Sequence, residues 1–189
     1  MTEKYLLLAA YFGGLLLYGL LNTRKNAPYD LRTALDRYIP LVPAFVVAYF
    51  GIFLFLPVAV VFLFETPLAI EFLIALVIGM YLAAIFWYLF PARMYRPEIT
   101  GHGVFDRIVA LLYHDDPHTN GFPSSHVINS VIASFYLSIA FPQYWIYICI
   151  VGVAIALSTV FIKQHRALDV VGGVVWAAVS IALARYFVG

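Results

Sequence analysis

Six apolar stretches divide this chain, and each is close to the length of a helix that spans a lipid bilayer. They cover residues 5–21, 39–64, 68–90, 124–141, 144–162 and 170–188. Only 11% of the residues are charged, whereas about a quarter are charged in a soluble domain. Backbone groups in lipid must pair within their own segment, which favours helices over open strands. The sequence therefore predicts an all-α, polytopic integral membrane bundle of six transmembrane helices, in a single domain covering residues 1–189.

The links between the stretches differ in length and in charge. Links 64–67 and 142–143 are short, whereas links 22–38, 91–123 and 163–169 are polar and carry most of the charges. With six crossings, the three polar links lie on one side of the membrane, and the short links and both chain ends lie on the other. All the candidate chemistry is therefore expected on one face of the bundle.

The basic residues favour one orientation, and a proline predicts one irregularity. The side of the short links has only Lys4 and Arg185, so the positive-inside rule places the face with the polar links in the cytoplasm. The expected location is the cell membrane.

We expect stretch 5–21 to be retained as a span, because no small-residue cleavage site follows it. In the long second stretch, Pro57 predicts a kink or a tilt.

A cluster before the last apolar stretch contains the first candidate catalytic pair. His165 and Asp169 are four residues apart, a spacing that places both on one face of a helix. A carboxylate that accepts a hydrogen bond from one imidazole nitrogen fixes the tautomer and leaves the other nitrogen free as a nucleophile. Taken alone, the pair is more often an ordinary ion pair on a helix surface at a membrane interface, because His/Asp pairs at this spacing are common.

A second cluster opens the fourth apolar stretch, where Pro123 precedes Ser124, Ser125 and His126. Proline suits the first turn of a helix, and the free N–H groups that follow it favour a bound anion. The two serine hydroxyls add donors for a phosphate, and His126 is placed to give a proton to a leaving oxygen. The simpler interpretation is a plain helix start with an interfacial histidine.

Two arginines follow the third apolar stretch and complete the set of candidate residues. Arg93 and Arg96 are candidates for phosphate binding, because a guanidinium binds phosphate oxygens in a bidentate way and keeps its charge. Either side chain could instead anchor the end of a span at the interface. The proline after Arg96 favours a functional role for that residue.

The order of these motifs resembles the type 2 phosphatidic acid phosphatase and vanadium haloperoxidase superfamily over roughly residues 68–188. Arg-Pro, Pro-Ser-x-His and Ser-x6-His-x3-Asp occur in the order of that family. The resemblance implies a six-helix core, a histidine nucleophile and, in the phosphatases, neither metal nor cofactor. It implies that His165 is the nucleophile, Asp169 its orienting acid and His126 the general acid. It also implies that Arg96 and Ser124 bind phosphate.

Three positions depart from the motifs of that family. Leu89 stands where the first motif has a lysine, and Arg93 is the nearby cation that could replace it. Ser125 replaces a glycine, and Thr159 replaces an arginine. We expect Lys163 to supply the missing charge, because it lies one helical turn from Thr159. These changes resemble the branch that contains the inositol-phosphorylceramide and sphingolipid synthases.

The expected function is hydrolysis of a phosphomonoester or pyrophosphate lipid through a phosphohistidine. The runner-up is a lipid phosphotransferase that moves a phospho-headgroup between lipids with the same nucleophile. The expected partners are the membrane and a lipid phosphate substrate, and the formal net charge of +1 gives no indication of a nucleic-acid partner. The sequence does not indicate an oligomeric state.

Two further classes of function stay open. A metal-dependent hydrolase could use His102 and the run His114-Asp115-Asp116-Pro117-His118, although its spacing matches no standard set of ligands. A transporter or scaffold without catalytic activity could use Glu71, because a carboxylate within a span can mark an ion path. Glu71 lies close to the end of its span, which favours contact with the interface instead.

Overall fold

The computed structural model describes residues 2–22, 27–116 and 119–188 of the protein. In these ranges the chain forms helices, and the β-pairing is limited to isolated bridges. The α-helices are α1 (Thr2–Leu21), α2 (Val46–Phe50), α3 (Ile52–Leu63), α4 (Ala69–Leu89), α5 (Val104–Asp115), α6 (Ser125–Ala140), α7 (Trp145–Phe161) and α8 (Ala167–Val188). Three 3-10 turns, η1 (Leu35–Arg37), η2 (Pro43–Phe45) and η3 (Pro142–Tyr144), join them. The all-α prediction is confirmed.

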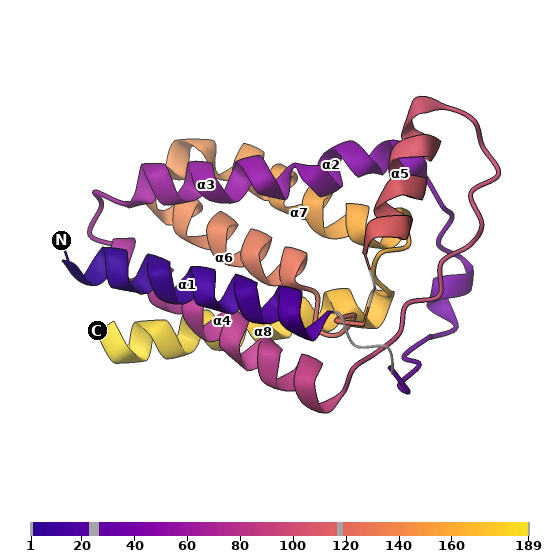
Figure 1. Ribbon diagram of the computed structural model, residues 1–189. Helices are drawn as coiled ribbons and strands as arrows, with labels where there is room; N and C mark the ends of the chain where they lie inside the picture. Colours follow the sequence, from indigo (N-terminus) through magenta and orange to yellow (C-terminus); the bar gives the residue numbers. More distant parts are fainter. Residues whose placement is uncertain (1, 23–26, 117–118, 189) are drawn as a thin grey trace.

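In the described part of the chain, five helical segments are long and apolar enough to cross a bilayer. They are Thr2–Leu21, Pro43–Leu63, Ala69–Leu89, Pro142–Phe161 and Ala167–Val188. The sixth expected span corresponds to α6, which is apolar but has only 16 residues. It lies between α3 and α7 on one side and α1, α4 and α8 on the other (Figure 1). The protein is thus a multi-pass membrane protein, in which the predicted number of six spans is approximate.

The second apolar stretch is interrupted at Gly51 and not at Pro57. Helix α3 runs through Pro57, whereas Gly51 separates α2 from α3. The turn at Gly51 is tight, because a Cβ at this position would lie 2.8 Å from the carbonyl oxygen of Ala48. The break in this stretch therefore lies more than one helical turn before the proline, and the kink or tilt expected from Pro57 stays a prediction.

The core lies where α4, α6 and α8 meet, and two glycines of α8 shape it beside the site. A Cβ at Gly173 would lie 2.7 Å from the Cβ of Val127, and a Cβ at Gly172 would lie 2.3 Å from the ring of Phe122. The absence of these side chains lets α8 pack closely against the start of α6. This packing brings the two polar clusters of the sequence together.

The long connections gather at one end of the bundle, and both chain ends lie at the other end (Figure 1). Three short segments of the links 22–38 and 91–123 run side by side, because Ala92 forms parallel bridges with both Tyr29 and Asn120. The link 91–123 also contains α5, a helix that we did not expect. Its buried residue Val109 packs in a small core with Tyr49 of α2. The polar links therefore meet on one face, as the pattern of the sequence indicates.

Candidate active site

His165 lies in the turn before α8 and is held by one hydrogen bond and by a nearby carboxylate. Its Nδ1 lies 2.9 Å from the carbonyl oxygen of Gly121 and 3.5 Å from Oδ2 of Asp169. A carbonyl oxygen can only accept, so Nδ1 carries the hydrogen and Nε2 is the free nitrogen of the neutral ring. Asp169 is fully buried, and its Oδ2 also accepts the N–H of Arg166 at 2.9 Å. The contact between His165 and Asp169 is therefore made at the helix start, and not along a helical face.

His126 lies in the first turn of α6 and is held by packing. Its ring stacks on Tyr49 at 4.2 Å between centroids, with 17° between the planes. The rings of His126 and His165 are 6.4 Å apart between centroids. The Nε2 of His126 is buried and has no hydrogen-bond partner among the described residues. The two histidines therefore lie at one site, with one nitrogen of His126 unpaired.

The two predicted serines occupy different positions around His126. The backbone N–H of Ser124 donates to the carbonyl oxygen of Asp169 at 3.2 Å, which ties the start of α6 to the start of α8. The hydroxyl of Ser124 is buried and has no partner within the described part of the chain. Ser125 faces an apolar space together with His126. The backbone N–H of Ser124 is thus already hydrogen-bonded within the protein, although we expected the N–H groups at this helix start to bind a phosphate.

Arg96 is buried in a network beside the histidines. It donates to the backbone oxygens of Tyr113 and Asp116, each at 3.0 Å, to the Asp116 carboxylate at 2.9 Å and to the side chain of Gln164. Burial lowers the pKa of Arg96, and Asp116 opposes this shift. The Nε of Arg96 is buried without a partner among the described residues. Asp116, Gln164 and His165 line one narrow space, so the network of Arg96 reaches the site.

Lys163 lies beyond the end of α7, so its expected place one helical turn from Thr159 on the same face is wrong, whereas its role as a phosphate ligand stays a prediction. Helix α7 ends at Phe161, and Lys163 follows it with a positive φ of 55°. Its ammonium group donates to the backbone oxygens of Asp36, at 3.3 Å, and of Ile39. Burial lowers the pKa of Lys163, and the charge of Asp36 opposes this shift. Thr159 is fully buried within the bundle.

Arg93 and Arg166 differ in how their side chains lie relative to the site, and Arg93 does not lie where a phosphate ligand is expected. The side chain of Arg93 is exposed and is not among the residues that line the site, and only its backbone contributes. Its N–H donates to the oxygen of Tyr29, and its oxygen accepts from Arg166. The side chain of Arg166 is 5% exposed and pairs with Asp30 at 3.3 Å. Arg166 is a site residue to which the sequence motifs assign no role, although its place next to His165 in the polar cluster indicates one.

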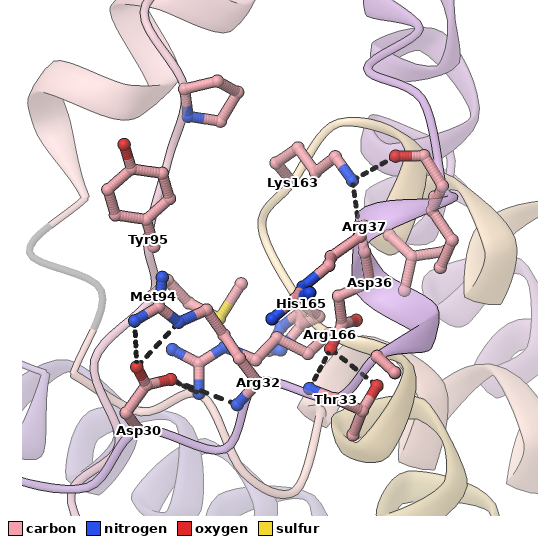
Figure 2. Close-up of a pocket in the computed structure, with 14 residues that line it drawn as sticks. Asp30, Arg32, Thr33, Asp36, Arg37, Met94, Tyr95, Lys163, His165 and Arg166 are labelled. Carbon is pink, nitrogen blue, oxygen red and sulfur yellow. Dashed lines mark hydrogen bonds and ion pairs between the residues drawn. The ribbon is translucent and has the colours of Figure 1, made fainter.

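A polar cavity of about 710 Å³ reaches His165 from the side of the long connections (Figure 2). Its walls come from residues 30–39, from residues 94–97 and from the turn between α7 and α8. Six of the fourteen residues that line it are charged: Asp30, Arg32, Asp36, Arg37, Lys163 and Arg166. His126 does not line this cavity.

An apolar groove of about 540 Å³ reaches His126 from the opposite direction. Residues of α1, α3 and α6 line it, among them Phe12, Phe53 and Leu56, and Ser125 and His126 lie at its inner wall. Phe12 and Phe53 are largely exposed, so the groove opens between α1 and α3 towards the region that lipid occupies. The histidine pair thus lies between two spaces of opposite polarity.

The residues considered for a metal site are spread over several contacts. His114 pairs with Asp115 at 2.9 Å on the surface, and Asp116 pairs with Arg96. His102 is exposed, and His118 lies outside the described residues. Residues 2–22, 27–116 and 119–188 contain no group of three or more His, Cys, Asp or Glu that could hold a metal ion.

Glu71 has partners at the end of the bundle that carries the chain ends. Its Oε1 accepts a hydrogen bond from the hydroxyl of Tyr136 at 2.9 Å and lies 3.7 Å from Nε of Arg185. Glu71 lies in the first turn of α4, away from the histidine pair. These contacts give the carboxylate a structural role at that end.

Three residues that hold the site were absent from our predictions. Tyr49 stacks on His126, Gly121 accepts from His165, and Gln164 accepts from Arg96. Gln164 precedes the histidine in the polar cluster, and Gly121 lies in the turn before Pro123. The positions of both residues in the sequence could therefore have indicated a role at the site. The position of Tyr49 could not, because it is one of many aromatic residues in an apolar stretch.

One known protein family matches the part of the chain that contains these site residues. The sequence model of the PAP2 superfamily matches residues 96–189, the C-terminal half of the chain. This region contains Arg96, His126, His165 and Asp169. Comparisons with curated proteins and with solved structures give no match. The match and the order of the motifs agree, and the chain belongs to the PAP2 superfamily.

Proposed function

We propose that this protein is a lipid phosphatase of the membrane, which hydrolyses a phosphomonoester or pyrophosphate lipid through a phosphohistidine without a metal ion. Membership of the PAP2 superfamily supports hydrolysis of phosphate esters in general. The observation that carries the finer proposal is the pair of histidine rings 6.4 Å apart, between a polar cavity and an apolar groove.

The two spaces favour a lipid over a water-soluble substrate. A lipid phosphate has a charged group that needs cations and a hydrocarbon part that is stabilised in apolar surroundings. The apolar groove ends at His126, which is the residue expected to protonate the leaving alcohol. A leaving group with a hydrocarbon chain would therefore lie in the groove, while the phosphoryl group lies between the histidines.

In the first step, Nε2 of His165 attacks phosphorus while the bond from phosphorus to the leaving oxygen breaks. The imidazole becomes positively charged, and the Nδ1–H that faces Gly121 and the carboxylate of Asp169 stabilises this charge. His126 gives a proton to the leaving oxygen. The products of this step are a free lipid alcohol and a phosphohistidine.

In the second step, water attacks phosphorus, and the bond from phosphorus to nitrogen breaks. His126, now neutral, takes a proton from the water, so both histidines return to their initial states. The proposed phosphate ligands are Arg96, through its unpaired Nε, and the hydroxyls of Ser124, which is also unpaired, and Ser125. Positioning and neutralisation of charge supply most of the rate enhancement in phosphoryl transfer.

The test is a phosphate-release assay with purified protein and a panel of lipid phosphates. We expect release that continues in the presence of EDTA, that vanadate inhibits, and that His165→Ala abolishes. The matched control is His102→Ala, which removes an exposed histidine on the same face and leaves the rate unchanged. Release that is unaffected by His165→Ala would contradict the proposal.

The same assay separates hydrolysis from phosphotransfer. A labelled lipid phosphate is supplied with and without a lipid alcohol. We expect the label to leave as inorganic phosphate in both cases. Label that moves to the added lipid alcohol would show that the acceptor is a lipid, and the runner-up function would replace hydrolysis.

A further inference from the structure

The polar cavity contains more positive charge than the reacting phosphoryl group accounts for. Its lining includes four cations and two carboxylates: Arg32, Arg37, Lys163 and Arg166, with Asp30 and Asp36. The cavity, at about 710 Å³, is also far larger than a single phosphate. An excess of cations in a concave space raises the local concentration of anions.

Both carboxylates of the cavity are already paired within the protein. Asp30 lies 2.6 Å from Arg32 and 3.3 Å from Arg166. Asp36 accepts from the N–H and the hydroxyl of Thr33, at 2.7 and 2.8 Å, and from the N–H of Ala167 at 2.9 Å. Asp30 thus compensates the arginines beside it, and Asp36 is held by donors that carry no formal charge.

Neither Arg37 nor Lys163 forms an ion pair with a carboxylate of the described residues, although the charge of Asp36 acts on Lys163. The side chain of Arg37 is exposed and forms neither an ion pair nor a hydrogen bond with the described residues. The ammonium group of Lys163 contacts two backbone oxygens, which solvate its charge but do not neutralise it. Lys163 also has a positive φ, and non-glycine residues with this conformation cluster at functional sites.

The position of these cations separates them from the leaving group. The cavity reaches His165, whereas His126 lines the apolar groove instead. A ligand in the cavity therefore lies on the aqueous side of the histidine pair. Residues 30–39, which supply Arg37, precede the region that the PAP2 superfamily model matches. This wall of the cavity is thus outside the part of the chain that the family match covers.

We propose that the polar cavity binds a second phosphate group, with Arg37 and Lys163 as its ligands, on the aqueous side of His165. This inference rests on the proposed function, since it concerns a group that accompanies the reacting phosphoryl. Two sources have the same chemistry. One is the inorganic phosphate released by hydrolysis, and the other is a second phosphate in the headgroup of the lipid.

The first experiment measures binding directly. Inorganic phosphate is titrated calorimetrically into the full-length protein in detergent, for the wild type and for Arg37→Gln. We expect the Kd to rise about tenfold in the variant, because one charge-assisted contact is lost. The matched control is Arg107→Gln, which removes an exposed cation of α5 outside the cavity and leaves the Kd unchanged. Equal affinities of the wild type and Arg37→Gln would overturn the proposal, as would an equal loss in Arg107→Gln.

The second experiment identifies the source of the phosphate. Inhibition by inorganic phosphate is measured, together with the ratio of kcat/KM for a lipid with two phosphates to that for a lipid with one. Weaker inhibition in Arg37→Gln supports the released product as the ligand. A lower ratio in the variant supports a headgroup phosphate. If both quantities match the wild type, the cavity binds neither, and the proposal fails.

These results are distinguishable from a failure of the proposed function. If His165→Ala leaves hydrolysis intact, the phosphohistidine mechanism is wrong, but calorimetric binding at Arg37 does not depend on turnover. If His165→Ala abolishes hydrolysis and the Kd is insensitive to Arg37, the mechanism stands and the second phosphate site does not.

Discussion

The two histidines of the site are held in different ways. His165 is placed by polar contacts of its Nδ1, a hydrogen bond to Gly121 and the carboxylate of Asp169 at 3.5 Å. His126 is placed by packing on the ring of Tyr49, and its Nε2 has no hydrogen-bond partner among the described residues. A nucleophile needs one fixed tautomer, which only directed bonds supply, whereas a proton donor needs a nitrogen that is free to change state. The difference therefore agrees with different roles for the two rings.

The largest effect that separates the two roles should come from His126→Ala. For a lipid phosphate we expect a loss in kcat of about a hundred- to ten-thousandfold, because no group protonates the leaving alcohol. For p-nitrophenyl phosphate we expect a much smaller loss, since nitrophenolate leaves without a proton. The check is kcat for both substrates in the wild type, His126→Ala and His165→Ala. His165→Ala should be inactive with both, and an equal loss with both substrates in His126→Ala would contradict a role as the acid.

A smaller loss, on the order of a hundredfold in kcat, should follow from Asp169→Asn, because a polar contact to a charged group contributes about 1.5–3 kcal/mol. The amide keeps the size of the carboxylate but removes the charge that faces Nδ1 of His165 at 3.5 Å. The measurement is single-turnover formation of the phosphohistidine, with circular dichroism as a check of folding. The control is Glu98→Gln, at an exposed carboxylate. Formation at the wild-type rate in Asp169→Asn would show that hydrogen bonding to Gly121 alone orients the ring.

Loss of the packing around His126 should lower kcat less than loss of the carboxylate that faces His165. We expect Tyr49→Leu to lower kcat by about tenfold or less, because a stacked aromatic pair contributes about 0.5–1.5 kcal/mol. Tyr49→Phe keeps the ring and should retain most of the activity. The comparison is kcat for the two variants with a lipid phosphate. If Tyr49→Phe loses as much as Tyr49→Leu, then the hydroxyl and not the stacking matters at this position.

Hydropathy predicted most of the fold, because lipid imposes both the length and the composition of a span. The short length of α6 was not predictable from that pattern. This helix is surrounded by its neighbours and holds buried polar residues such as Asn129 and Ser130, so its composition follows from packing. Helix α5 was missed because it lies in a polar link, where one amphipathic face packs against Tyr49.

The site was predictable where the motif itself fixes the geometry. The spacing of His165 and Asp169 indicated their contact, although a turn and not a helix produces it. The positions of Lys163 and Arg37 were not predictable, because they depend on the path of residues 27–40 across the end of the bundle. No periodic pattern in the sequence encodes that path. Long-range contacts fix it, such as the hydrogen bond from the N–H of Ala167 to Asp36.

The smallest effect should come from Asp36→Asn, which tests how residues 30–39 are held against the site. Burial alone would raise the pKa of Asp36, but hydrogen bonds from Ala167 and Thr33 outweigh it, so the pKa lies below its usual value of 3.8. The carboxylate therefore contributes stability above pH 3.8, and this contribution is lost as the pH falls through the lower pKa of the folded state.

We expect Asp36→Asn to lower the free energy of unfolding by about 0.5–1 kcal/mol at pH 7, a small value because the carboxylate is only partly shielded from solvent. The measurement is thermal unfolding of both proteins in detergent at pH 7 and near pH 3. Since the wild-type carboxylate is increasingly protonated at the lower pH, the difference between the two proteins should shrink there. A difference that stays constant with pH would show that the size of the side chain, and not its charge, holds residues 30–39 in place.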